Sequence, residues 1–180
     1  GFKLCIGYKG EFLSICKAML KTGILPDFIT IDSADGGTGA APVSLMDYVG
    51  LPIQESLPIA VDSIIQAGLR DRIKVIASGK LINPAEVAWA LCVGADFISS
   101  ARGFMMSLGC IQALQCARNT CPIGIATHDP LLQKGLVIAT KANRVKNYVN
   151  KLEHEFYELS GSMGIKHCRD LSPQNLFKLA

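Results

Sequence analysis

A chain of 180 residues in which 49% of the side chains are hydrophobic and 18% are charged can bury a substantial core, so we expect one globular domain. The net charge of +3 is interspersed along the chain, which argues against nucleic-acid binding, and no apolar run reaches the roughly 20 residues needed to cross a membrane. The seven cysteines are an odd number and the amino terminus does not resemble a signal peptide, so we expect a reducing, cytoplasmic setting.

The first half of the chain alternates β-rich runs with amphipathic stretches. It predicts strands at 2–6 and 28–31, a helix that begins at Glu11, and a second helix over 57–67. Gly23 and Gly68 are natural helix stops, because glycine adopts the left-handed conformation that ends a helix.

The second half continues the alternation. It predicts strands at 73–77 and 97–99 and helices at 83–92, 105–114 and 141–159. Asn83, Pro84 and Glu86 form the pattern of an N-cap, a first-turn proline and a capping carboxylate, so the start of the 83–92 helix is strongly marked.

Apolar strands that are each followed by a helix indicate an α/β fold whose parallel sheet is covered on both faces. Glycine-bearing loops at the carboxyl ends of successive strands favour a (β/α)8 TIM barrel. Four units supply only half of it, so we expect 1–130 to be the carboxy-terminal half-barrel and 131–180 a helical extension of the same domain. The other half would be chain upstream of Gly1, a partner, or a second copy that covers the open edges.

Two loops after the last strands combine glycine with a basic residue, which suits a phosphate group. Their residues are Ser78, Gly79 and Lys80, and Ala101, Arg102 and Gly103. The alternative is that both glycines only form tight turns.

Two further features belong to the same predicted barrel mouth. The stretch Asp35, Gly36, Gly37, Thr38 is glycine-dense enough to lie against a planar ligand, although a surface loop is the alternative. Lys3 on a buried strand needs a partner and could stabilise negative charge on a ligand; otherwise the strand starts late and Lys3 lies in solvent.

Cys110, Cys116 and Cys121 lie within twelve residues, in polar surroundings, with Pro122 after the last of them. Thiolates are the ligands of iron-sulfur clusters, and three cysteines without a clear fourth favour a three-iron cluster. The competing hypothesis is a zinc site completed by His128.

The chain resembles the FMN-binding synthase domain of glutamate synthases, and most of all the small glutamate-synthase-related proteins. The segments that carry the resemblance are FKLCIG (2–7), DFITID (27–32), DGGTGAAP (35–42), GLRDRIKVIASGK (68–80), GADFISSARGFM (94–105) and GCIQALQCARNTCPIGIATHDP (109–130).

This resemblance implies a (β/α)8 barrel that binds FMN at the two loops and the glycine stretch, with Lys3 at the active-site mouth. It also implies a [3Fe-4S] cluster on the three cysteines, which passes electrons from a donor protein or subunit to the flavin. The implied reaction is reductive amination of 2-oxoglutarate to glutamate, with ammonia that is free or derived from glutamine. The alternative from another class is a non-catalytic half-barrel or assembly module with zinc or no metal.

Overall fold

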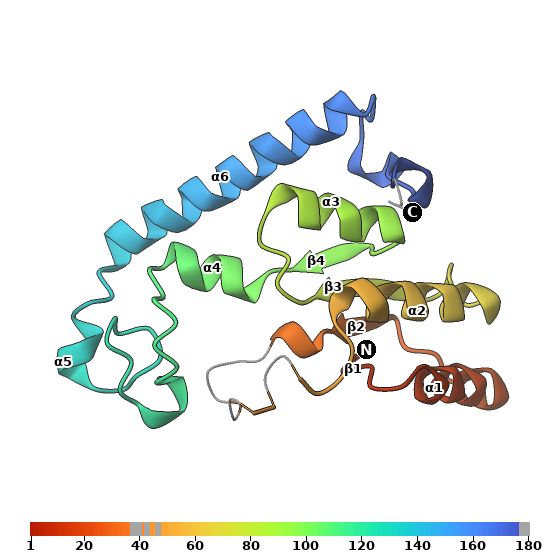
Figure 1. The fold of residues 1–180 in the computed structure, drawn as a ribbon, viewed down its shortest axis with the longest axis horizontal. Coiled ribbons are helices and arrows are strands. Elements are labelled where there is room, and N and C mark those ends of the chain that lie inside the picture. The colour runs from red at the N-terminus through yellow and green to blue at the C-terminus, as the bar shows by residue number, and fades with distance from the viewer. Residues whose placement is uncertain (37–40, 42–43, 46–47, 177–180) are drawn as a thin grey trace.

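The computed structural model describes residues 1–36, 41, 44–45 and 48–176, and its centre is a four-stranded parallel sheet of order β1-β2-β3-β4 (Figure 1). The strands are β1 (Phe2–Cys5), β2 (Phe28–Asp32), β3 (Lys74–Ser78) and β4 (Phe97–Ser99). The main helices are α1 (Lys9–Thr22), α2 (Ile53–Gln66), α3 (Pro84–Val93), α4 (Ala101–Ser107), α5 (Pro130–Gln133) and α6 (Ile138–Ser162). Short 3₁₀ turns are η1 (Ala34–Gly36), η2 (Cys116–Arg118), η3 (Cys168–Asp170) and η4 (Pro173–Asn175). The predicted parallel α/β class is confirmed.

The sheet packs its core on one face only. Ile29, Ile31 and Val75 are 0% exposed, and they lie in one core cluster with apolar residues of α1 and α2. Side chains alternate along a strand, so their neighbours point the other way, and Phe28 and Phe97 are 41% and 59% exposed there. The expectation that both faces are covered is therefore wrong for this chain, because four strands leave the sheet open where a closed barrel would have an interior.

Local capping signals fixed several helix ends as predicted. Gly23 follows α1 in the left-handed conformation (φ 69°), and Gly68 (φ 68°) follows α2. At the start of α3, the N–H of Glu86 donates to the Asn83 side chain (3.0 Å), and the N–H of Asn83 donates to the Glu86 carboxylate (3.1 Å). This reciprocal capping box satisfies donors that the helix itself leaves unpaired.

Two helix boundaries differ from the prediction. Helix α2 begins at Ile53, one turn before 57–67, because Ile53 and Leu57 share a fully buried face. Helix α4 covers Ala101–Ser107 and not 105–114, because Gly109 (φ 99°) and Gln112 (φ 55°) have backbones that no right-handed helix contains.

The predicted helix over 141–159 is confirmed as α6, which is three residues longer at each end. Its second half packs on α3 through Phe156, which is 8% exposed and shares a small core cluster with Cys92 and Leu171. Its first half extends over α4 toward the cysteine segment, as Figure 1 shows. Among the residues that the structure describes, no helix is long and apolar enough to span a membrane.

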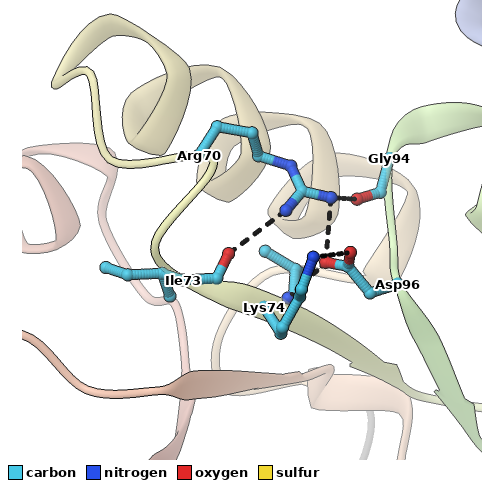
Figure 2. A network of polar contacts seen from close by, with 6 residues as sticks. Arg70, Ile73, Lys74, Gly94 and Asp96 are labelled. Carbon is cyan, nitrogen blue, oxygen red and sulfur yellow. Dashed lines mark hydrogen bonds and ion pairs between the residues drawn. The ribbon is translucent and has the colours of Figure 1, made fainter.

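An ionic network holds the amino-terminal ends of β3 and β4 together (Figure 2). Asp96 lies 2.8 Å from the Arg70 guanidinium and accepts a 2.8 Å hydrogen bond from the N–H of Val75. Arg70 also donates to the carbonyls of Ile73 (3.1 Å) and Gly94 (2.9 Å). The network therefore joins the loops before both strands, at the edge of the sheet opposite the predicted ligand site.

Replacing Asn83 with alanine is expected to lower the free energy of unfolding by about 1 kcal/mol, because the first turn of α3 loses its side-chain acceptor. Urea unfolding followed by circular dichroism measures this change. Asn143→Ala on the exposed side of α6 is the matched control and should be neutral or slightly stabilising, since alanine is the better helix former. An equal loss in both variants would contradict the capping role.

Candidate functional site

Lys3 lies on the open face of the sheet and forms an ion pair with Asp32, with 2.8 Å between Nζ and the carboxylate. The strand begins at Phe2, so a late start is wrong, but the expectation of a buried strand is also wrong, because Phe2, Lys3 and Cys5 are exposed. Lys3 stands in register with Thr30, and Cys5 with Asp32, so these four side chains share the open face near the carboxyl ends of β1 and β2. The Lys3 side chain is 58% exposed, so its ammonium remains accessible to a ligand.

A cleft of about 460 Å³ lies beside the carboxyl ends of β2 and β3. Three predicted residues line it, namely Asp35, Gly79 and Lys80, together with residues from the starts of α2 and α3. Lys80 Nζ lies 3.9 Å from the Asp35 carboxylate, and Trp89 of α3 lines the same cleft. The structure thus brings these parts of two predicted loops into one cavity wall.

Ser33, a residue that the sequence analysis did not select, organises this wall. It is 5% exposed, its N–H donates to the Ser78 carbonyl (2.9 Å), and its hydroxyl accepts from the N–H of Asp35 (2.9 Å). A Cβ on Gly79 would lie 2.6 Å from Ser33 Cβ and Oγ, so glycine is needed there for loop packing. The structure thus gives Gly79 a packing role, which also fits the alternative of a tight turn, and phosphate binding by this loop stays a prediction.

Lys80 has a left-handed backbone conformation (φ 49°), which is unusual for residues other than glycine, asparagine and aspartate. Such a conformation costs on the order of 1 kcal/mol and persists where the surroundings impose it. Here the carboxyl end of β3 and the start of α3 fix it, and they direct Lys80 to the cleft that Asp35 lines.

The second predicted loop lies elsewhere. Ala101, Arg102 and Gly103 form the first turn of α4, so the expectation of an open loop is corrected to a helix start. Gly103 lines a different cleft of about 450 Å³, which also includes Ile82 of the β3–α3 connection and Arg144 of α6. The residues Gly37 and Thr38 lie outside the part of the chain that the structure describes, and Gly36 ends η1.

Ser100 marks the junction between β4 and α4. Its hydroxyl is buried and has no hydrogen-bond partner among the described residues, and a Cβ on Gly103 would lie 2.9 Å from it. A buried hydroxyl without a partner is costly, so this atom is suited to a ligand acceptor such as a phosphate oxygen. Ser100 lies in the segment 94–105, but its residue type alone gives no signal for this role.

Tyr148 of α6 connects the two loops. Its hydroxyl donates to the Ile82 carbonyl (2.8 Å), its ring meets Phe104 edge to face at 5.5 Å, and a side chain on Gly103 would collide with its hydroxyl. Tyr148, which lies 66 positions after Ile82 in the sequence, thus holds the β3–α3 connection against the first turn of α4. Nothing in the local sequence of either loop indicates this contact.

Replacing Tyr148 with phenylalanine is expected to lower the free energy of unfolding by about 1–2 kcal/mol, since the Ile82 carbonyl loses its donor while the ring contact remains. Urea unfolding measures the change. Tyr157→Phe is the control, because Tyr157 is 53% exposed and its ring also meets a phenylalanine; it should stay within about 0.5 kcal/mol. Equal behaviour of both variants would show that the Tyr148 hydroxyl contributes nothing.

The cysteine segment forms a separate loop between α4 and α5, at one end of the molecule (Figure 1). Cys110 and Cys116 are partly exposed and Cys121 is 7% exposed. Within the described ranges, no three side chains of His, Cys, Asp or Glu lie close enough to hold one metal ion. The donor chemistry fits a cluster, but the three thiols do not form a ready-made ligand set, and the same holds for a zinc site with His128.

Backbone hydrogen bonds favour the thiolate form of Cys121. Burial raises the pKa of its thiol, but nearby backbone N–H groups outweigh that effect and hold the pKa below its ordinary value. The donors belong to Ala126, Ile123, Ile125 and Gly124. In contrast, burial raises the pKa of Cys16 and Cys92, as expected for structural cysteines. The turn after Cys121 therefore has the character of a thiolate-ligand site.

A comparison with known protein families shows to which family this chain belongs. The family described as "Conserved region in glutamate synthase" matches residues 11–166. The chain belongs to this glutamate synthase family. The segments that resembled glutamate synthases lie largely within the matched range, so that prediction is confirmed.

Curated relatives agree with the assignment to the glutamate synthase family. The "Glutamate synthase large subunit-like protein YerD" of Bacillus subtilis is 50% identical over 165 residues, which cover 92% of this chain and 31% of the relative. The "Archaeal glutamate synthase [NADPH]" of Methanocaldococcus jannaschii is 38% identical over 145 residues, covering 81% and 28%. The "Glutamate synthase [NADPH] large chain" of Bacillus subtilis is 34% identical, covering 78% and 9%. The chain spans under a third of these relatives.

Solved structures confirm the fold. A flavocytochrome b2 mutant with benzoylformate superimposes with a TM-score of 0.59 at 16% identity, over 96% of this chain and 33% of that one. A second mutant with pyruvate bound gives a TM-score of 0.58 at 14% identity, over 96% and 32%. This similarity concerns only the fold. It agrees with the prediction that this chain forms half of a TIM barrel.

Proposed function

We propose that this chain is the carboxy-terminal half of the catalytic barrel of a glutamate synthase-type oxidoreductase. The reaction is reductive amination of 2-oxoglutarate to glutamate, with FMN as the bound cofactor and a [3Fe-4S] cluster as the electron entry. The family match over 11–166 is the observation that carries the proposal. The chemistry of the loops at the carboxyl ends of β2, β3 and β4 supports it.

The chain's own residues fit the phosphate end of a flavin nucleotide. The Ser100 hydroxyl lacks an acceptor among the described residues, and it lies beside Gly103 in the first turn of α4. Arg102 adds a guanidinium to that turn, and Lys80 lies on the other loop. Ser78, Gly79 and Ala101 contribute backbone, and Asp35, Gly36, Gly37 and Thr38 remain the proposed contacts of the ring system.

FMN, when bound, supplies the hydride for reduction of the imine that 2-oxoglutarate forms with ammonia. The residues of this chain bind and orient. Lys3 presents an ammonium on the open sheet face beside Asp32, where it can hold a substrate carboxylate or offset negative charge on the flavin. We expect Lys3→Met to raise KM for 2-oxoglutarate or lower kcat, because the Asp32 carboxylate would then repel the anionic substrate.

The proposed cluster ligands are Cys110, Cys116 and Cys121. The four N–H groups around the Cys121 sulfur support a thiolate there. Since the three thiols are not grouped in the structure, cluster binding would have to draw the segment 110–121 together.

A half-barrel needs its complement. The open face exposes Phe28 and Phe97, and among the strands that the structure describes β1 and β4 are the edges of the sheet. We propose that the other half of the barrel covers this face, and that the flavin site is complete only in that assembly.

The test is anaerobic purification of the assembled protein, followed by a visible spectrum and an assay for glutamate. We expect flavin bands with a broad cluster shoulder, and glutamate formation that requires 2-oxoglutarate, ammonium and reduced methyl viologen. A colourless protein that contains zinc, or no metal, would instead support the non-catalytic half-barrel.

A further inference from the structure

The open face of the sheet is ordered in rows that cross the four strands. The row at the carboxyl edge is polar, and its members in register are Cys5, Asp32, Ser78 and Ser99. The row below it is neutral apart from one lysine, and its members are Lys3, Thr30, Ile76 and Phe97. Lys3 therefore starts in a row that offers its ammonium no carboxylate.

The ion pair of Lys3 and Asp32 runs along the strands and not straight across them. Lys3 stands in register with Thr30, and Asp32 lies two residues beyond Thr30 on the same strand, which is about 6.5 Å further toward the carboxyl edge. The Nζ atom of Lys3 nevertheless lies 2.8 Å from the Asp32 carboxylate. The stem of Lys3 must therefore extend along the sheet, so that its ammonium reaches the row at the barrel mouth.

Asp32 is itself held by the backbone. Its Oδ1 atom accepts a hydrogen bond from the N–H of Ser33 (3.1 Å), while its Oδ2 atom faces Lys3. The same N–H donates to the Ser78 carbonyl of β3 (2.9 Å), so the carboxylate is anchored where β2 and β3 end. The side chains of Asp32 and Lys3 are 26% and 58% exposed. The carboxylate is thus the fixed member of the pair, and the long lysine side chain is the flexible one.

This ion pair contributes little to the stability of the fold. Water screens a pair of partly exposed charges, and the lost rotamer freedom of the lysine offsets much of the remaining attraction. The pair does change where the ammonium lies before any ligand binds. A group that is held in place beforehand loses less freedom when the ligand arrives, and it meets the ligand in a defined geometry. The pair therefore matters for the position of the ammonium, and hardly for the fold.

We propose that Asp32 is a positioning residue, which holds the Lys3 ammonium at the mouth of the barrel. This inference rests on the proposed function, because it specifies how Lys3 meets a carboxylate of 2-oxoglutarate or negative charge on the flavin. Asp32 acts through Lys3 and makes no contact of its own with either ligand. A misplacement of about 1 Å in such a group can slow a reaction on the order of 100-fold, so the effect of Asp32 is expected mainly in kcat.

A first experiment measures the restraint on Lys3 without substrate or turnover. The assembled protein is treated with trace acetic anhydride, and peptide mass spectrometry gives the acetylation rate of Lys3 relative to that of Lys17, an exposed residue of α1. Asp32→Asn should raise this relative rate about threefold, because an exposed ion pair restrains the amine by roughly that factor. The control is Asp71→Asn, an equal charge change in an exposed turn, which should leave the rate unchanged.

A second experiment measures glutamate formation by Asp32→Asn in two backgrounds, with Lys3 present and with Lys3→Met. With Lys3 present, Asp32→Asn should lower kcat about tenfold and change the KM for 2-oxoglutarate by less than about threefold, since the ammonium remains but is misplaced. In the Lys3→Met background, the same substitution should leave kcat within about twofold and lower KM, because it removes a carboxylate that repels the anionic substrate. Asp32→Glu keeps the charge and should retain more of kcat than Asp32→Asn.

Loss of kcat from Asp32→Asn in both backgrounds would overturn the proposal, because Asp32 would then act on its own or through the fold. A raised KM for ammonium in both backgrounds would also overturn it, since Asp32 would then bind that cation directly. An unchanged acetylation rate of Lys3 in Asp32→Asn would show that the carboxylate does not hold the ammonium. If the unmodified protein forms no glutamate, the proposed function fails, while the acetylation rates still decide whether Asp32 positions Lys3.

Discussion

Replacing Cys121 with serine is expected to remove essentially all iron from the anaerobically purified protein. A thiolate is the preferred ligand of iron-sulfur clusters, and a serine hydroxyl replaces it poorly. Cys121 is also the thiol whose pKa the neighbouring backbone N–H groups lower, so its loss affects the position that most favours a thiolate. Iron and sulfide analysis, together with the visible spectrum, measures the effect.

Cys168→Ser is the matched control, because Cys168 is exposed and lies in η3, outside the 110–121 segment. It should retain full iron content, while Cys116→Ser should behave like Cys121→Ser. Unchanged iron in the Cys121 variant would refute the cluster assignment. If the protein instead holds zinc that both Cys121→Ser and His128→Ala remove, the zinc hypothesis is correct.

Replacing Asp96 with alanine should lower the free energy of unfolding by about 2–3 kcal/mol. The carboxylate accepts from the Val75 N–H (2.8 Å) and pairs with Arg70 (2.8 Å), so its removal leaves the Val75 N–H without its side-chain acceptor and the guanidinium without a counter-charge. Arg70 and Asp96 side chains are 27% and 18% exposed, so solvent screening keeps the loss below that of a fully buried pair. Lys74, which is 55% exposed, adds little.

Urea unfolding of three variants separates the contributions at this network. Asp96→Asn keeps an acceptor for Val75 but removes the charge, so it should lose less than Asp96→Ala. Asp62→Ala, on the exposed face of α2, should stay within about 0.5 kcal/mol. If Asp96→Ala behaved like Asp62→Ala, the network in Figure 2 would contribute nothing to stability.

Much of the secondary structure followed from local signals. Glycines after α1 and α2 and the capping box of α3 are residues whose own chemistry ends or begins a helix, so they do not depend on distant contacts. Strand β4 was predicted at its observed bounds for the same reason, since apolar residues lie between two turn signals. The α4 prediction failed because the apolar spacing of 105–114 was helical, while the backbone at Gly109 and Gln112 was not.

The site was predictable only in part. The two loops and Asp35 were selected from their glycines and charges, but the structure divides them between two clefts and shows that Ser33, Ser100 and Tyr148 organise them. Serines in a loop and a tyrosine in an amphipathic helix are too common to indicate such roles. Their positions depend on contacts between elements far apart in the chain.

The sequence by itself determined the α/β class, the half-barrel and the family, because periodicity, capping and short motifs are encoded locally. Only the tertiary structure decided which groups meet: Lys3 with Asp32, Arg70 with Asp96, and Tyr148 with the Ile82 carbonyl. These arrangements arise when helices pack on the sheet, and the distances that packing sets between remote residues are not written in any one segment.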